Sequence, residues 1–155
     1  MADVVDAATR SRMMAGIRGK DTKPEMILRR GLHARGFRYR LHDKRLPGAP
    51  DLVFPARHAV IFVNGCFWHG HECHLFRLPS TRQEFWREKI ERNRARDAAA
   101  EAALLADGWR VLTIWECALK GKDKLPRQEV LDRTADWIVN GQSRSTIAGE
   151  ADGGF

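Results

Sequence analysis

Hydrophobic positions at helical spacing predict three helices in this chain. The first covers residues 23–35, and its start, Thr22-Lys-Pro-Glu25, has the spacing of a capping box with proline in the first turn. A second, long helix is predicted over residues 81–106, where Thr81-Arg-Gln-Glu84 repeats the capping-box spacing. The third covers residues 127–139 and ends before a glycine.

Four shorter stretches predict strands. Residues 37–42 alternate large and basic side chains, as in a strand with one face in water, and residues 109–115 are mostly apolar. Residues 51–54 and 59–63 are joined by a short link, which favours an antiparallel hairpin. The second of these is apolar throughout, as a central strand covered on both faces would be. The order of elements therefore predicts an α/β fold, a mixed sheet flanked by helices.

These elements fit a single domain over residues 21–141, and we find no internal repeat. Residues 1–20 contain small and basic side chains and two glycines that weaken a helix, so we predict a flexible N-terminal arm. Residues 142–155 are polar and rich in glycine, and we predict that they form a disordered tail.

Basic charge is concentrated near the N-terminus. The net charge is +7, and residues 1–46 hold twelve basic against five acidic side chains, whereas the remaining residues are balanced. Such a patch is typical of proteins that follow a phosphate backbone, although a solvated basic face is the alternative. We expect Arg12 in the arm and Lys89 on the long helix to contact nucleic acid. The chain shows neither a bilayer-spanning apolar window nor a signal peptide, so we expect a cytoplasmic protein without a membrane partner.

The segment Asn64-Gly-Cys-Phe-Trp-His-Gly-His-Glu-Cys-His74 concentrates metal-binding and aromatic side chains. Three of its residues and one cysteine after the last predicted strand make a three-thiolate, one-imidazole set: Cys66, His71, Cys73 and Cys117. Tetrahedral zinc binds such a set, and a closed four-ligand shell is structural. The spacing is not that of a standard zinc finger, cysteines also occur as plain buried hydrophobes, and His74 is an alternative ligand.

Other residues carry candidate catalytic groups. Asp51 begins the strand that pairs with the one leading into the loop, and its carboxylate could hold Mg²⁺, although a Pro-Asp pair is often just a turn. Glu25 can be a simple capping residue, and Asp97 can pair with a neighbouring arginine. His69, three residues past Cys66, could move a proton to or from a metal-adjacent water.

The aromatic side chains of the loop suggest a contact with DNA bases. Phe67 and Trp68 lie in a loop too short to bury both, so we predict that they are wedges pushed between base pairs. Unstacking a step costs a few kcal/mol and is least costly at a mismatch. Trp86 could join them, or it could belong to the core.

An ordered series of motifs runs from Ala2 to about Asn140. They are Ala8-Thr-Arg-Ser-Arg12, Leu46-Pro-Gly-Ala-Pro-Asp51, Gly65-Cys-Phe-Trp-His69, Thr81-Arg-Gln-Glu-Phe-Trp86, Arg96-Asp97, Gly108-Trp-Arg-Val-Leu112 and Trp115-Glu-Cys-Ala-Leu119. Through these motifs the chain resembles the very-short-patch-repair (Vsr) DNA mismatch endonucleases. The resemblance implies a restriction-endonuclease-like fold of the PD-(D/E)XK type with a structural zinc. It also implies a nick 5′ of the thymine in T:G mismatches that arise by deamination of 5-methylcytosine in double-stranded DNA.

The resemblance also implies residue roles. Asp51 would bind Mg²⁺ together with the backbone carbonyl of Val63, His69 would be the active-site base or acid, and Asp97 and Glu25 would support them. The aromatic wedge would enter from the major groove, and Met14 of the arm would enter from the minor groove. We expect a monomer, with other mismatch-repair proteins as further partners.

Asn64 departs from the family, which usually has histidine at this position beside the metal. An amide can hydrogen-bond a phosphate oxygen but cannot exchange a proton at neutral pH. Two alternatives to the mismatch nickase therefore stay open. One is a zinc-stabilised DNA-binding protein with weak or lost activity, and the other is a nickase with a different target.

Overall fold

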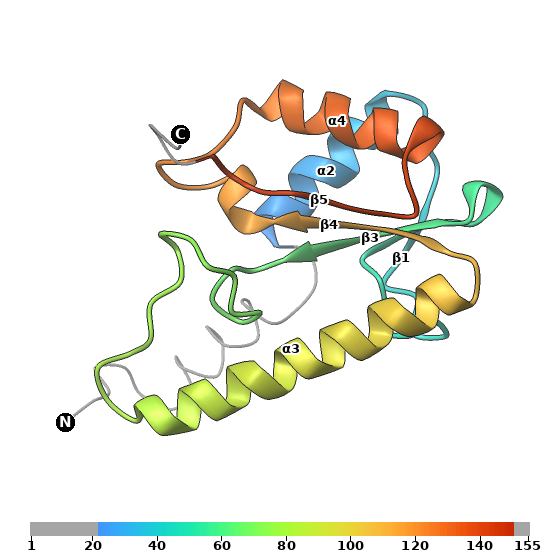
Figure 1. The fold of residues 1–155 in the computed structure, drawn as a ribbon. Coiled ribbons are helices and arrows are strands. Elements are labelled where there is room, and N and C mark those ends of the chain that lie inside the picture. The colour runs from blue at the N-terminus through green and yellow to red at the C-terminus, as the bar shows by residue number, and fades with distance from the viewer. Residues whose placement is uncertain (1–21, 151–155) are drawn as a thin grey trace.

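The computed structural model describes residues 22–150, which form a five-stranded sheet with helices on both faces (Figure 1). Residues 1–21 and 151–155 are not described, so the predicted arm with Arg12 and Met14 lies outside the described residues. The elements, in chain order, are α2 (Lys23–Ala34), β1 (Arg40–Leu41), β2 (Leu52–Phe54), β3 (Ala59–Asn64), α3 (Gln83–Ala106), β4 (Arg110–Trp115), α4 (Arg127–Asn140) and β5 (Arg144–Ile147).

The sheet is mixed, and its spatial order follows the chain order β1-β2-β3-β4-β5. The first three strands are antiparallel, and Leu52 pairs with Ile61 in the predicted hairpin between β2 and β3. β4 and β5 then run parallel to β3, with Asn64 opposite Trp115. The long α3 connects the parallel pair β3 and β4, as a parallel crossover requires.

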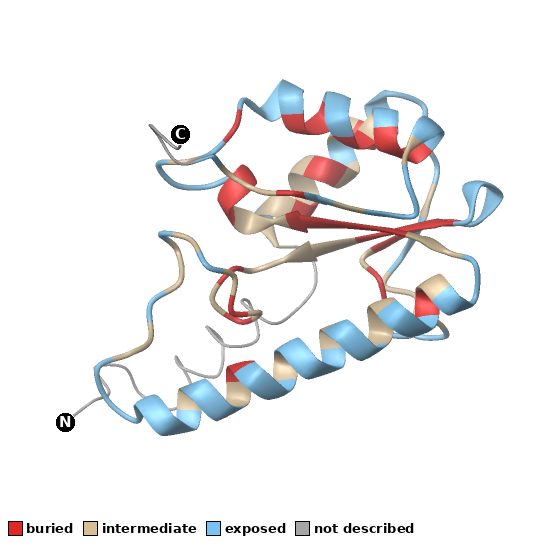
Figure 2. Cartoon of the chain, viewed as in Figure 1, coloured by how far each residue is buried: buried red, intermediate tan, exposed pale blue. Residues whose placement is uncertain are grey.

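Alternation along the strands divides the apolar side chains between two cores. The larger core lies between the sheet and the helices α2 and α4, and it includes Leu52, Phe54, Ile61, Leu112 and Ile114 from the strands. On the opposite face, Val53, Val60 and Val111 pack against Leu104 of α3. The alanine- and leucine-rich second half of α3 therefore packs on the sheet, whereas Ile90 is the buried residue of its first half (Figure 2). Both faces of β3 are covered, as its continuous apolar sequence predicted.

Helix α2 begins as its capping box predicted. The Thr22 hydroxyl accepts a hydrogen bond from the Glu25 N–H, with 3.4 Å between the heavy atoms, and proline occupies the first turn. The corresponding prediction for α3 is wrong. Its N-cap is Arg82 in the left-handed region, without a side-chain cap, and the helix begins at Gln83.

Two further predictions need correction. The strand expected over residues 37–42 is reduced to Arg40–Leu41. The tail expected to be disordered from residue 142 instead contains β5, whose Ile147 is buried and pairs with Ile114 of β4. Its sequence Arg-Ser-Thr-Ile carries one strongly apolar side chain, so the pattern was too short and too polar to be read as a strand.

Between residues 22 and 150, no helix combines the length and the apolar character needed to cross a bilayer.

Candidate active site and metal centre

The predicted catalytic residues line one broad groove. Because β2 and β3 are antiparallel, the residue before β2 and the residues that end β3 lie at the same edge of the sheet. The groove at this edge also extends to the first turn of α2 and to α3. Its lining includes Glu25, His42, Asp51, Val63, Asn64, Phe67, Trp68, His69, Lys89 and Asp97.

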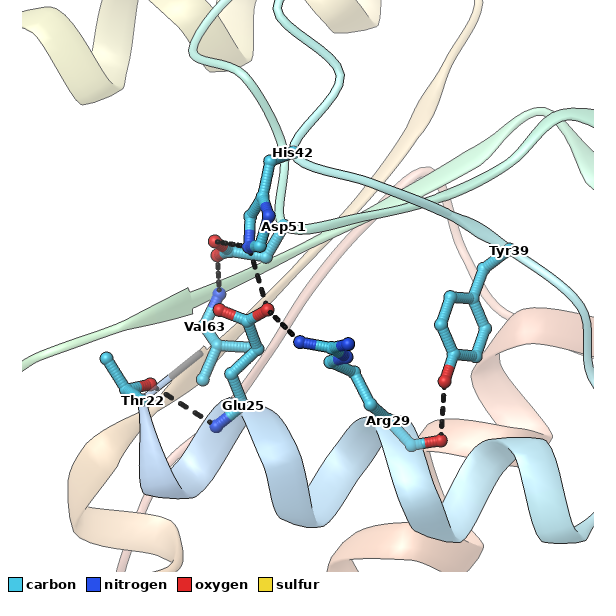
Figure 3. A network of polar contacts seen from close by, with 7 residues as sticks. All are labelled: Thr22, Glu25, Arg29, Tyr39, His42, Asp51 and Val63. Atoms are coloured by element: carbon cyan, nitrogen blue, oxygen red, sulfur yellow. Dashed lines mark hydrogen bonds and ion pairs between the residues drawn. The ribbon is translucent and has the colours of Figure 1, made fainter. Parts of the chain in front are cut away.

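Asp51 is held firmly at the centre of this groove. Its Oδ2 accepts a hydrogen bond from the Val63 N–H at 2.7 Å, and its side chain is 22% exposed (Figure 3). Burial raises the pKa of Asp51 to about 6, although the Val63 N–H acts in the opposite direction. Burial disfavours an ionised carboxylate, so a cation placed beside it would restore the charged form.

Glu25 points its carboxylate toward Asp51 and is 1% exposed. The sequence left open whether Glu25 is a simple capping residue. Its backbone N–H does take part in the cap, but its side chain is directed at the groove, where Oε2 lies 2.7 Å from His42 Nε2 and 3.6 Å from Arg29. Glu25 is therefore part of the site as well as of the helix start.

His42 is the residue of this cluster that the sequence did not single out. It follows β1 directly, and its φ of +45° places it in the left-handed region, which turns its ring toward Glu25 and Asp51 (Figure 3). Donor atoms of Glu25, His42 and Asp51 all lie within 4.8 Å of one another. Two carboxylates and an imidazole so close together can hold a divalent cation.

His69 and Asp97 form a second pair at the groove. The loop after β3 carries the histidine and α3 carries the aspartate, and His69 Nδ1 is hydrogen-bonded to Asp97 Oδ2. Asp97 thus pairs with His69, and not with a neighbouring arginine, which was the alternative. A carboxylate at Nδ1 fixes the ring orientation and leaves Nε2 as the nitrogen that can exchange a proton.

The four predicted zinc ligands come together. Donor atoms of Cys66, His71, Cys73 and Cys117 lie within 4.8 Å of one another. His71 Nδ1 is 3.6 Å from the sulfurs of both Cys66 and Cys117. In a tetrahedral site, Zn–S and Zn–N bonds of about 2.3 and 2.05 Å would separate sulfur from nitrogen by about 3.6 Å. The donor set and its spacing therefore fit a zinc ion.

Surrounding groups hold these ligands in place. The His71 ring stacks on Trp115 at 4.2 Å, and the Cys66 N–H donates to Glu116 Oε1. A hydrogen bond from Cys66 lowers the pKa of Cys117 to about 5, while the same contact raises the pKa of Cys66. The lowered pKa favours the thiolate form of Cys117, which is the form that binds a metal.

His74 does not join the donor set. Its Nδ1 lies 3.1 Å from a carboxylate oxygen of Asp123. Of the two histidines, His71 is therefore the one that belongs to the metal cluster.

Five aromatic rings gather beside this cluster. Phe67 is the centre, with ring centroids 5.2 Å from Trp68, 5.6 Å from Trp86 and 6.1 Å from Phe76; Phe85 joins through Trp86. As the length of the loop predicted, its two aromatics are not both buried: Phe67 is half-buried, whereas Trp68 is 7% exposed and packs against Trp86 with ring centroids 5.7 Å apart. The Trp68 indole N–H is buried without a hydrogen-bond partner among residues 22–150.

Comparison with known proteins shows to which family this chain belongs. A sequence profile described as "DNA mismatch endonuclease Vsr" matches residues 2–75. The DNA mismatch endonuclease Vsr of Escherichia coli is 48% identical over 138 residues, which cover 89% of this chain and 88% of that protein. This chain belongs to the Vsr family of DNA mismatch endonucleases.

Other Vsr relatives are described as nicking enzymes. The type II nicking enzyme V.XorIIP of Xanthomonas oryzae pv. oryzae is 52% identical over 119 residues, covering 77% of this chain and 88% of the relative. The type II nicking enzyme V.NmeAIP of Neisseria meningitidis is 43% identical and covers 79% of this chain and 87% of its own length. The Vsr identity and the nicking function predicted from the motifs are thereby confirmed, and the five-stranded α/β fold is that of a Vsr nuclease.

Proposed function

We propose that this chain nicks one strand of double-stranded DNA 5′ of the thymine in a T:G mismatch left by deamination of 5-methylcytosine, with Mg²⁺ as the catalytic ion. The observation that carries this proposal is a single groove containing the half-buried Asp51 carboxylate, the His69–Asp97 pair and the aromatic loop. The groove thus combines candidates for ion binding, proton transfer and base contact. We also propose that the mixed sheet flanked by helices is a restriction-endonuclease-like fold of the PD-(D/E)XK type, a proposal that membership of the Vsr family supports.

Asp51 and Glu25 would hold the ion, with the Val63 carbonyl as a further candidate ligand. Mg²⁺ at such a site polarises a phosphoryl oxygen, lowers the pKa of a bound water and stabilises a departing oxygen. The Val63 N–H fixes one oxygen of Asp51, so that the other oxygen can face the ion. Glu25 is buried and the Asp51 side chain is 22% exposed, which would limit the access of bulk water to the ion.

His69 would move the proton of the reaction. Asp97 would accept a hydrogen bond from the Nδ1–H of His69 and leave Nε2 free to exchange a proton near the scissile phosphate. Asn64 ends β3 on the same groove and can contribute a hydrogen bond to a phosphate oxygen but not a proton. We therefore assign proton transfer to His69 and phosphate contact to Asn64.

The DNA duplex would lie along α3 and the loop after β3. Lys89 lines the groove and can contact a phosphate, and we propose the same role for Arg12. Phe67, Trp68 and Trp86 would enter the base stack from the major groove, which requires Trp68 to move out of its buried position against Trp86. Met14 would enter from the minor groove. A zinc on the Cys3His cluster would fix the loop that carries Phe67, Trp68 and His69. Monomeric state, cytoplasmic location and further mismatch-repair partners stay predictions.

A nicking assay tests the proposal directly. Duplexes that differ only in a T:G or a T:A pair, each strand labelled separately, are incubated with and without Mg²⁺. We expect a single nick 5′ of the mismatched thymine that requires Mg²⁺ and is lost in Asp51→Asn. Equal cleavage of both duplexes would refute the mismatch claim, and absence of any cleavage would favour the DNA-binding alternative that Asn64 raises. Cleavage confined to another mismatch or to a paired site would support the alternative target.

A further inference from the structure

The cluster around Asp51 contains a nitrogen donor that the proposed function does not use. His42 Nε2 lies 2.7 Å from Glu25 Oε2 and 3.8 Å from Asp51 Oδ1. The His42 side chain is 14% exposed, so its ring is enclosed with the carboxylates and not displayed in solvent. Figure 3 shows it approaching both carboxylates from the side opposite α2.

Backbone geometry fixes the direction of each donor. Asp51 Oδ2 is engaged by the Val63 N–H, so Oδ1 is the oxygen that faces His42. The backbone N–H of His42 donates to the Asp51 carbonyl at 3.1 Å, which ties the end of β1 to the start of β2. The left-handed φ of His42 then directs the ring inward. A non-glycine residue in this region is uncommon, although histidine is among the residues enriched there.

The separations match those of neighbouring ligands on one ion. An octahedral site with bonds of about 2.1 Å places adjacent ligand atoms about 3 Å apart and opposite ones about 4.2 Å apart. The separations of 2.7 Å between His42 and Glu25 and 3.8 Å between His42 and Asp51, within a cluster spanning at most 4.8 Å, lie close to this range. Small movements of the three side chains would bring all three donors onto one cation.

The charges in the cluster also call for a cation. Glu25 and Asp51 contribute two carboxylates, and Arg29 lies 3.6 Å from Glu25. A neutral imidazole adds a donor without adding charge. Two carboxylates and an imidazole form a mixed oxygen and nitrogen set, whereas Mg²⁺ prefers oxygen ligands and imidazole suits transition metals.

Resting on the proposed function for the ion site itself, we propose that His42 is a third protein ligand of the catalytic cation and makes this site bind Mn²⁺ more tightly than Mg²⁺. His42 coordinates through Nε2, Asp51 through Oδ1 and Glu25 through a carboxylate oxygen. The remaining positions are left for water and a phosphate oxygen. The competing role for His42 is that of a hydrogen-bond donor that only orients Glu25.

Magnetic resonance on the full chain separates these two roles. The protein is loaded with Zn²⁺ to fill the cysteine cluster, freed of excess metal, and titrated with Mn²⁺ in the absence of DNA. Continuous-wave spectra give the Mn²⁺ affinity, and pulsed spectra detect coupling to an imidazole nitrogen, confirmed by ¹⁵N-histidine labelling. The test variant is His42→Gln, whose amide can still donate a hydrogen bond to Glu25. The matched control is His33→Gln, the same change at an exposed position of α2.

We expect imidazole coupling in the unsubstituted protein, its loss in His42→Gln and its retention in His33→Gln and His69→Gln. Mn²⁺ affinity should fall by about tenfold or more in His42→Gln, with a smaller change for Mg²⁺, since removal of even an outer partner of a metal site costs ten- to hundredfold. Absence of coupling in the unsubstituted protein, or its persistence in His42→Gln, would overturn the proposal. If His42→Gln fails to fold, the spectra of the unsubstituted protein and of His69→Gln still test the proposal. Loss of the imidazole coupling in His69→Gln would overturn the assignment of His42 as a ligand.

The nicking assay keeps the two proposals separate. Mg²⁺-dependent nicking at T:G without imidazole coupling would leave the function intact and remove His42 from the ligand set. Imidazole coupling without nicking would support the ion site and refute the mismatch activity.

Discussion

Replacing Gly149 by alanine should loosen the Cys66, His71, Cys73 and Cys117 cluster, the proposed zinc site. The Gly149 N–H donates to the Cys117 sulfur at 3.2 Å, and the next residue, Glu150, donates to the Asp123 carbonyl at 2.9 Å. A Cβ at position 149 would lie 2.4 Å from the Cys117 carbonyl oxygen and 2.7 Å from that of Asp123. Both neighbours are backbone atoms, so the segment after β5 must move away and both hydrogen bonds are lost.

The magnitude follows from these contacts. Two hydrogen bonds at about 1 kcal/mol each give a loss of about 2 kcal/mol. At about 2–4 °C per kcal/mol for a chain of this size, the melting temperature of the zinc-loaded protein should fall by about 4–8 °C. Loss of the N–H contact to a ligating sulfur should also weaken zinc binding by about ten- to hundredfold.

Thermal unfolding and competition with a chromophoric zinc chelator measure both effects. The matched control is Gly65→Ala, where the nearest atoms to the added Cβ lie 3.8 Å away, in ordinary van der Waals contact. Gly149→Ala with the stability and zinc affinity of the unsubstituted protein would refute the conclusion that the C-terminal segment supports the zinc centre.

Four further predictions concern the reaction and the stability of the protein. Asp97→Asn should slow single-turnover nicking by about 10²–10⁴-fold, because an amide that donates to Nδ1 moves the His69 proton to Nε2. The control is Asp107→Asn, the same change at the exposed end of α3. A nicking rate of Asp97→Asn within threefold of the unsubstituted protein would contradict the role of Asp97. Asn64→His should leave nicking unchanged or faster if Asp51 and His69 are already in place, and a clear loss of rate would contradict this arrangement. Mg²⁺ affinity should fall by up to about tenfold per pH unit below pH about 6, because burial raises the pKa of Asp51 and a proton then competes with the ion. Without divalent ions, the folded state holds the Asp51 proton more tightly than the unfolded chain does, so the free energy of unfolding should decline as pH rises from about 4 to about 6. Asp51→Asn should remove this pH dependence. A pH dependence unchanged by the substitution would argue against the raised pKa of Asp51.

The sequence determined the elements whose hydrophobic pattern is long and regular. The continuous apolar run of β3 predicted a strand covered on both faces, and the capping box at Thr22 predicted where α2 begins. The donor chemistry of three cysteines and a histidine predicted one metal cluster, although Cys117 lies 44 residues after Cys73. These results depend on local spacing and on side-chain chemistry, which the sequence displays directly.

Tertiary structure decided what depends on partners distant in the chain. β5 is short and polar, and it becomes a strand because β4 offers an edge with which it can pair. Trp68 is buried because Trp86, on another element, covers it. His42 enters the active site through one left-handed backbone angle and two carboxylates that are distant in sequence. Such contacts arise from the packing of elements against one another, so no local pattern in the sequence predicts them.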